Sequence, residues 1–326
     1  MRWRLCVLLF LLLPGGATAE EPEIRRYGAP PEVRPLAPTG PMRWAQQMIC
    51  CGEDDRRPVD MSTWPHRAIA YVEILDDFGF HLSNCTGAVI GTGLVLTAAH
   101  CVYDPDGSQW GGGWAPALRI APAKNGSLEP YSYQFAVDAL VPNGWSTGSS
   151  AYDWGLILLP DARMTSATGE IPLGVFTTAT LSSPTFGISL VGYAGERSTW
   201  GVVPYGASRP SFVQVTDTRL YYDIDTSGGQ SGAPVWQTSA PRVLGVHTLG
   251  GALANSATRM TSAMVQSMDS ACRTVGCSFS AYMEPVPTAT PTARPTVTPT
   301  PRATSTPVVT ALRRVFLPLS SRLGGA

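Results

Sequence analysis

Between residues 49 and 280 the hydrophobic residues gather in short runs that glycine- and proline-rich stretches separate. The clearest runs are AIAYVEIL at 68–75, GAVIGTGLVLTAAH at 87–100, WGLILL at 154–159 and RVLGVHTLGG at 242–251. Short apolar runs bounded by turn residues are typical of buried β-strands. Many such strands at close spacing favour an antiparallel barrel or sandwich, so this region is predicted to be an all-β domain.

One segment follows the helical period instead. Thr261 or Ser262 can cap the start of a helix that runs over residues 261–268. Its apolar side chains recur at the spacing that places them on one face: Met260, Met264, Val265 and Met268. We expect a short C-terminal helix whose methionines pack into the core.

The segment before this domain lacks a pattern that builds a core. Residues 1–19 combine arginines, the apolar run Leu5–Leu13 and a small-residue end at Ala17–Ala19, which is the pattern of a secretory signal peptide. The apolar run is too short to span a bilayer. Residues 20–48 are rich in proline and arginine and are interpreted as a propeptide.

The segment after the domain changes composition again. Residues 281–310 alternate proline with threonine and are expected to form an extended, semi-rigid linker. Residues 311–326 form a tail with one apolar patch, Val315–Leu319, which is a candidate attachment or sorting segment at the cell surface.

The charge balance excludes some partners. The chain has 326 residues, and its 23 basic and 24 acidic side chains give a formal net charge of only −1. No global field therefore collects nucleic acid or an anionic membrane surface. We expect no nucleic-acid partner and no membrane span.

Six cysteines remain once the signal segment is removed, and an even number in an oxidising compartment favours disulfides. Their spacing lacks the paired units of a zinc site, so no metal is expected. Adjacent Cys50 and Cys51 would form a strained bridge, and their pairing with Cys272 and Cys277 is favoured. A local Cys272–Cys277 loop is the alternative, and the sequence does not choose between them.

Three short motifs contain the groups that serine acyl transfer requires. His100 lies in TAAHC at the end of an apolar run, Asp153 precedes the apolar run in YDWGLI, and Ser231 lies in GGQSGAPV. Such chemistry needs a hydroxyl nucleophile, a base beside it, and a carboxylate that orients the base.

The order His, Asp, Ser and these motifs resemble the chymotrypsin-like serine peptidases. The resemblance implies two antiparallel six-stranded β-barrels with a boundary near 165–178, and a catalytic triad that needs no cofactor. It also implies an oxyanion hole formed by the N–H groups of Gly229 and Ser231. Cys85 and Cys101 match the family disulfide beside the histidine, which would contribute roughly 3 kcal/mol by closing a loop of about sixteen residues.

One position departs from the vertebrate digestive relatives. These carry an acid directly before the nucleophile, which receives the new N-terminal ammonium when the zymogen is cut. Gln230 occupies that position here. Activation by that salt bridge is therefore not expected.

The blocks DTSGGQSGAPV, GVHTLGG, GEDDRRPV and RAIAYV resemble the bacterial glutamyl endopeptidases of the V8 type. That resemblance implies cleavage after glutamate, less readily after aspartate, with His247 and Thr226 binding the substrate carboxylate. It places the mature N-terminus near Ile49, where the new amine would complete the pocket. An extended substrate is expected to pair along Thr248–Gly250.

Two other interpretations remain open. Asp225 lies six residues before the nucleophile, where it would hold arginine or lysine in a trypsin-like enzyme. The chain could also be an inactive surface-binding module on a peptidase scaffold. The favoured prediction is a secreted, monomeric endopeptidase whose partners are protein or peptide substrates.

Overall fold

The computed structural model describes residues 22–34, 47–50, 52–197 and 202–285. The chain divides into one unit at Met1–Val286 and a second at Pro287–Ala326. The predicted signal segment, nearly all of the predicted linker, the tail and Cys51 lie outside the described residues.

The first half of the domain forms an eight-stranded antiparallel sheet. Its strands are, in spatial order, β1 (Pro22–Arg26), β11 (Asp138–Pro142), β12 (Gly155–Leu158), β6 (Leu94–Thr97), β5 (His81–Gly91), β4 (Ile69–Leu75), β9 (Ala117–Pro122) and β10 (Gln134–Phe135). Only Ala136 and Val137 separate β10 from β11; Ala136 N donates to Leu118 O of β9 at 3.0 Å, and Val137 N donates to Leu158 O of β12 at 2.8 Å. The sheet therefore curls until its two ends meet, and forms a barrel.

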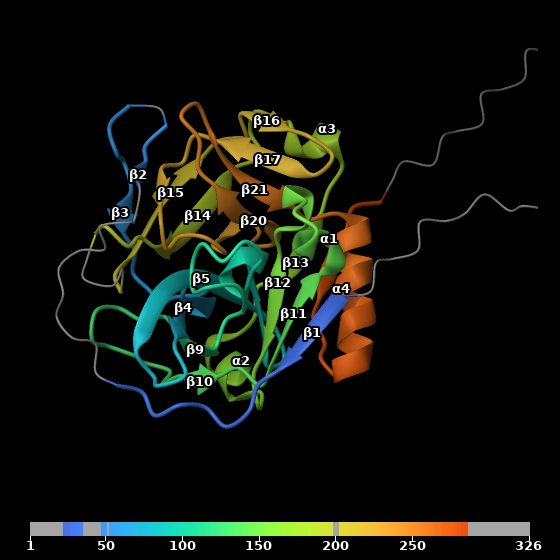
Figure 1. The fold of residues 1–326 in the computed structure, drawn as a ribbon. Coiled ribbons are helices and arrows are strands. Elements are labelled where there is room, and N and C mark those ends of the chain that lie inside the picture. Colours follow the sequence, from blue (N-terminus) through green and yellow to red (C-terminus); the bar gives the residue numbers. More distant parts are fainter. Residues whose placement is uncertain (1–21, 35–46, 51, 198–201, 286–326) are drawn as a thin grey trace, which may run out of the picture. The chain divides into compact units, whose positions relative to one another are not determined.

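The second half forms a ten-stranded sheet. Its path runs through β16 (Gln214–Val215), β17 (Arg219–Tyr222), β21 (Asn255–Arg259), β20 (Val243–Leu249), β19 (Pro234–Gln237), β14 (Ile188–Tyr193), β15 (Pro204–Arg209) and β3 (Arg57–Pro58). Off this path, β13 (Leu173–Val175) pairs with β20 and with β22 (Ala281–Met283). Figure 1 shows the two sheets as separate groups of arrows.

The fold confirms the predicted two-barrel, all-β architecture, with extra strands at the sheet edges. Without β1 and the short β10, six strands remain in the first sheet, and without β16, β3, β13 and β22, six remain in the second. The predicted buried strands are present: all residues of β4, β6 and β12 are buried, and β20 is buried except at Leu249.

Two edge strands lie outside the predicted limits of the domain. Strand β1, in the predicted propeptide, pairs with β11 in the register Pro22↔Pro142 to Arg26↔Asp138. Strand β22 begins directly after residue 280, and the Glu284 carboxylate then accepts from Thr177 N at 2.6 Å. The ordered chain therefore continues past the predicted end of the domain.

The predicted helix is α4, which is longer than expected. It spans Ser262–Val275, and the Thr261 side chain caps it by accepting from Met264 N. Gly276, in the left-handed conformation, ends it. Met260, Met264 and Met268 are buried in the core, as predicted.

Short helical turns connect the strands, and the sequence pattern did not reveal them because each has fewer than two full turns. They are η1 (His66–Ala68), η2 (Ala99–Cys101), α1 (Asn143–Ser146), η3 (Ser150–Tyr152), α2 (Arg163–Thr168) and α3 (Thr178–Leu181). Two two-stranded sheets complete the described elements: β2 (Gln47–Met48) with β18 (Thr226–Ser227), and β7 (Tyr103–Asp104) with β8 (Gly113–Trp114).

The disulfides correct one prediction. Cys85 pairs with Cys101, as the family resemblance implied, but Cys272 pairs with Cys277 in the local loop that was the alternative. The C-terminal end of α4 explains this pairing, because Cys277 N donates to Cys272 O and so brings the two Cα atoms to 4.5 Å. Cys50 instead lies beside Asp225, with its sulfur 3.8 Å from Oδ1.

Among the described helices, the longest runs of apolar residues fall short of what a bilayer-spanning helix needs.

Candidate active site

The first barrel brings two of the predicted site residues together. His100 lies in η2, directly after β6, and Asp153 follows η3 at the start of β12. The strands β6 and β12 are neighbours with Thr97 opposite Gly155, so the two adjoining turns meet at one end of the barrel. Asp153 accepts from His100 twice, at Oδ1 from the backbone N at 3.1 Å and at Oδ2 from Nδ1 at 2.9 Å.

The pair is electrostatically matched. The Asp153 side chain is 3% exposed and the His100 side chain 19% exposed. Burial alone would lower the pKa of the His100 imidazole, but the charge and hydrogen bond of the Asp153 carboxylate offset this, so that the pKa lies above its ordinary value of 6.5. Asp153 thus fixes Nδ1 and leaves Nε2 as the nitrogen that can exchange a proton.

The second barrel places Ser231 against β5, the neighbour of the strand β6 that precedes His100. Ser231 O accepts from Thr86 N at 2.8 Å, and Thr86 adjoins Cys85 of the disulfide to Cys101. Next to Ser231, a Cβ on Gly232 would lie 2.2 Å from Thr97 Oγ1, so the two barrels touch closely here. The partly exposed Ser231 and His100 therefore flank one inter-barrel contact.

The loop before Ser231 presents two backbone donors. Gly228 O accepts from Gly195 N at 2.8 Å, and because a trans peptide points its C=O and N–H in opposite directions, Gly229 N–H faces the other way. The N–H groups of Gln230 and Gly232 are bonded, to Ser227 O and His247 O. Within the described residues, those of Gly229 and Ser231 have no partner. These are the two donors that the family resemblance assigned to an oxyanion hole.

Gly229 is suited to this loop by its backbone. Its φ is +94°, a region that residues with a Cβ rarely adopt. A Cβ there would lie 2.4 Å from Tyr193 O and 2.7 Å from Asn84 Nδ2. The position therefore demands glycine for two independent reasons.

Cys85, His100 and Cys101 hold ligand atoms within 4.8 Å of one another. The two sulfurs form a disulfide, so they are not thiolates that could bind a metal. The cluster is therefore His100 beside a disulfide.

Three of the residues predicted to bind the substrate are buried near Ser231. Thr226, His247 and Thr248 are 0%, 4% and 6% exposed. Within the described residues, the hydroxyls Thr226 Oγ1 and Thr248 Oγ1 have no hydrogen-bond partner. A buried hydroxyl without a partner costs about 1–3 kcal/mol, so both sites would gain from a polar ligand.

His247 is held in its neutral form. Its Nδ1 lies 2.6 Å from the Tyr222 hydroxyl. Burial, with the nearby charges of His100 and Arg219, lowers its pKa to about 3. The imidazole is therefore uncharged near neutral pH.

The N-terminal segment lies against the same loop. Strand β2 pairs with β18 in the register Thr226↔Met48, and Cys50 N donates to Asp225 Oδ1 at 3.0 Å. Ile49, between them, is half-buried. Gly250 is exposed just after β20, where the register with β21 shifts between His247 and Leu249.

Two arginines at this site were not singled out by sequence. Arg56 is 2% exposed and contacts Gln230, and Arg219 is 7% exposed and donates to Ser150 O and Ser256 Oγ. Arg56 stands in a run of five charged residues, which is typical of a solvated segment, so no local signal marks it as buried. Nothing in the sequence around Arg219 distinguishes it from a surface arginine.

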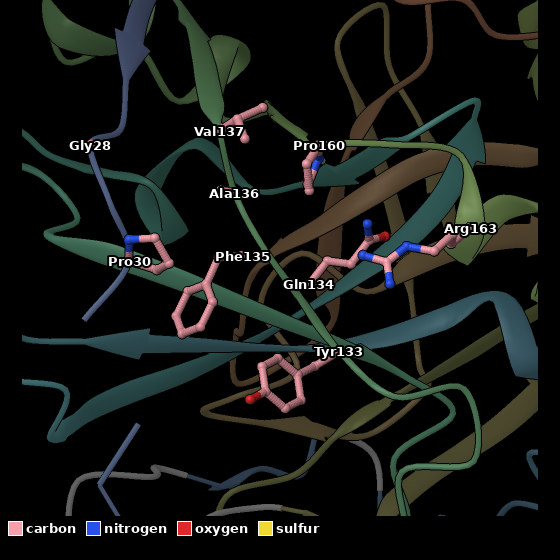
Figure 2. Close-up of a pocket in the computed structure, with 9 residues that line it drawn as sticks. All are labelled: Gly28, Pro30, Tyr133, Gln134, Phe135, Ala136, Val137, Pro160 and Arg163. Carbon is pink, nitrogen blue, oxygen red and sulfur yellow. The ribbon is translucent and has the colours of Figure 1, made fainter. Parts of the chain in front are cut away.

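A cavity of about 340 Å³ lies elsewhere, between the segment after β1 and the edge of the first barrel (Figure 2). Its lining residues are Gly28, Pro30, Tyr133, Gln134, Phe135, Ala136, Val137, Pro160 and Arg163. None of these is a predicted site residue, so the cavity is separate from the candidate active site.

Known proteins resemble this chain in sequence and in fold. The chain is 33% identical over 222 residues to a glutamyl endopeptidase of Bacillus licheniformis. The aligned region covers 64% of this chain and 65% of that protein. The chain is 30% identical over 217 residues to an extracellular metalloprotease of Bacillus subtilis, with the same two coverages. The chain thus spans about 65% of the length of each curated relative.

A solved structure of a Glu endopeptidase in complex with MPD superposes with a TM-score of 0.59 at 27% identity. It covers 68% of this chain and 98% of that chain. The family model described as Trypsin matches residues 57–269, well over half of the chain. With its two barrels and its His100–Asp153 pair, the chain belongs to the trypsin family of chymotrypsin-like proteins.

Proposed function

We propose that the chain is a secreted serine endopeptidase whose nucleophile is Ser231. The observation that carries the proposal is the 2.9 Å contact between His100 Nδ1 and Asp153 Oδ2, beside the loop that presents Ser231. The relatedness to a glutamyl endopeptidase supports the reaction class. We further propose that residues 1–19, 20–48 and 281–310 act as signal peptide, propeptide and linker, and residues 311–326 as an attachment segment.

The proposed reaction has two steps, acylation of Ser231 and release of the acyl group by water, and the triad acts in both. His100 Nε2 takes the proton from Ser231 Oγ as the oxygen attacks the peptide carbonyl, and then gives it to the leaving amine. Asp153 holds the tautomer and stabilises the imidazolium. Water, deprotonated by the same nitrogen, then releases the acyl group from Ser231.

The charge that develops on the carbonyl oxygen needs donors in place beforehand. The N–H groups of Gly229 and Ser231 fill this role, since their loop neighbours already use their own donors internally. No rearrangement of the loop is needed at the moment of attack.

We propose that the substrate pocket binds a carboxylate. In this proposal Tyr222 donates to Nδ1 of the neutral His247, so the imidazole hydrogen lies on Nε2, and Thr226 Oγ1 lacks a partner within the described residues. Arg219 adds positive charge near His247. Two neutral donors and a nearby cation favour an anionic side chain over a cationic one.

Asp225 does not support the trypsin-like alternative. It is 3% exposed, and its Oδ1 already accepts from Cys50 N at 3.0 Å. The carboxylate is thus buried and already holds the N-terminal segment through one of its oxygens, which disfavours it as the ion-pair partner of a substrate arginine or lysine.

The position of the N-terminal segment supports maturation near Ile49. Strand β2, just before Ile49, lies on the pocket loop at Thr226 and Ser227. Cleavage there would create an ammonium at the edge of this loop, where it would add a positive charge beside Thr226 and His247.

The test is digestion of matched peptides that differ only in Glu, Gln or Arg at the cleavage position. We expect processed enzyme to cut after Glu at least about tenfold faster than after the uncharged isostere Gln, since the pocket's donors pair with the full charge. Ser231→Ala should show no cleavage above background. Preferential cutting after Arg would refute the carboxylate pocket, and cutting by Ser231→Ala would refute the nucleophile.

A further inference from the structure

Arg56 is a buried cation that links the N-terminal segment to the loop of the nucleophile. Its side chain is 0% exposed. Nη2 contacts Asp54 Oδ2 at 2.7 Å and Glu196 Oε1 at 2.5 Å, while Nη1 donates to Gln230 Oε1 at 2.7 Å. The guanidinium therefore binds the carboxylates of Asp54 and Glu196 through Nη2 and the amide oxygen of Gln230 through Nη1.

Gln230, directly before Ser231, transmits this contact to the backbone. The residue is 0% exposed. Its Oε1 accepts from Arg56 and also from Ser227 N at 3.0 Å, and its Nε2 donates to Tyr205 O at 3.2 Å. The side chain thus ties the start of the Ser227–Ser231 loop to its end, and the whole loop to β15.

A second contact fastens the same loop. Arg56 Nη1 lies 3.3 Å from Ser227 Oγ, which in turn donates to the Glu196 carboxylate. Arg197 also contacts Asp54, so the cluster pairs two arginines with two acids. Balanced, hydrogen-bonded charges around a buried cation favour one arrangement of the loop.

These contacts are present while the chain is still uncleaved at Ile49. Met48 and Cys50, the residues on either side of Ile49, both contact the pocket loop, at Thr226 and Asp225. We propose that Arg56 is a positioning residue that holds the two oxyanion donors ready, through Gln230, before any N-terminal cleavage. It does so with a side-chain cation in place of a new terminal ammonium. The inference rests on the proposed function of Ser231 and adds a separate claim about how its loop is built.

The guanidinium fork is essential to this role. Lysine at position 56 would keep the charge but offers a single nitrogen, which cannot serve Gln230 and both carboxylates in the same geometry. A displacement of the loop by about 1 Å lowers kcat by up to about a hundredfold. Ground-state binding in the pocket, made by other residues, should change little.

The first arm of the test is a double-mutant cycle on kcat and KM with Arg56→Lys, Gln230→Leu and the double variant. We expect each single variant to lower kcat by about ten- to a hundredfold with KM within about threefold, and the double variant to be no worse than the poorer single one. Arg57→Lys, the exposed neighbour, should match the wild type. Multiplicative losses in the double variant, or a KM effect alone, would overturn the proposal.

A further variant keeps the test decisive if Arg56→Lys or Gln230→Leu does not fold. Gln230→Glu keeps the acceptor for Arg56 and for Ser227 N and gives up only the donor to Tyr205 O, so it should keep kcat within about tenfold of the wild type. A loss of more than about tenfold in this folded variant, verified by thermal unfolding, would contradict a role of Arg56 through that acceptor.

The second arm compares the full chain before removal of the residues preceding Ile49 with the processed form, using an organophosphorus fluoride and intact mass. Both forms should gain one adduct on Ser231, at rates within about tenfold, since the oxyanion donors are already placed. Labelling of the processed form alone would overturn the inference while leaving the proposed function standing. Labelling of neither form would refute the proposed function itself.

Discussion

Replacement of Gly229 by alanine tests the oxyanion loop directly. At φ +94° the new Cβ would lie 2.4 Å from Tyr193 O and 2.7 Å from Asn84 Nδ2. The Tyr193 contact is with backbone of the second barrel, which cannot yield easily. The peptide between Gly228 and Gly229 must therefore rotate, and its N–H leaves the position that faces the substrate.

The magnitude follows from two separate effects. The left-handed backbone costs roughly 1–2 kcal/mol of stability for a residue with a Cβ. Loss of one oxyanion donor lowers kcat by about 100- to 1,000-fold, or about 3–4 kcal/mol of transition-state stabilisation. Gly111→Ala is the matched control, because Gly111 has φ +95° and a Cβ added there would meet no atom within 4 Å.

The assay is steady-state hydrolysis of a Glu peptide together with urea unfolding of both variants. Gly229→Ala should lose kcat by about 100- to 1,000-fold with little change in KM, whereas Gly111→Ala should lose only about 1–2 kcal/mol of stability. If Gly229→Ala kept kcat within a few-fold of the wild type, the Gly229 N–H would not be an oxyanion donor.

Three further predictions concern the groups around this loop. Asp153→Asn should lower kcat by about 10⁴-fold and move the acid limb of the kcat/KM profile to lower pH, because the carboxylate raises the pKa of His100 above 6.5; an unmoved limb would count against the pair. The fold lowers the pKa of His247 to about 3, so between about pH 6.5 and 3 its imidazole binds a proton in the unfolded chain but not in the folded one. The free energy of unfolding should therefore decrease as the pH is lowered through this range. Urea unfolding should show His247→Gln flattening this dependence by at most about 1.4 kcal/mol per pH unit, and identical slopes would contradict the assignment. Replacing both cysteines of a disulfide by alanine should lower the free energy of unfolding by about 3 kcal/mol for Cys85–Cys101 and about 2 kcal/mol for Cys272–Cys277, because the bridges close loops of 16 and 5 residues. Only loss of the Cys85–Cys101 bridge should also reduce kcat. Equal kcat losses in the two variants would show that this bridge does not steady His100.

The strands and the candidate triad were predictable because their signals are local. A buried strand such as 69–75 is a nearly continuous apolar run, and this run alone is enough to predict the strand from the sequence. The residues His100, Asp153 and Ser231 lie at strand ends beside short motifs. The family order then implied which of these motifs meet.

The features that the sequence did not reveal depend on contacts between distant segments. Arg56 lies among five charged residues in a row, a run that is usually solvated, and only its contact with Gln230, 174 residues later, makes it a buried cation. The pairing of β1 with β11 likewise depends on an open sheet edge that no local pattern marks. The Cys272–Cys277 bridge required knowing that α4 continues to Val275, where its end brings the two sulfurs together.

The central claim is that Ser231 is acylated during turnover with His100 as its base. The most direct measurement is acid quenching of the processed enzyme during hydrolysis of a slow glutamyl ester, followed by mass spectrometry of the digested protein. We predict one acyl group per chain, located on Ser231, and none on the His100→Ala variant within the same time. An acyl group on another residue, or turnover without any covalent adduct, would contradict the account.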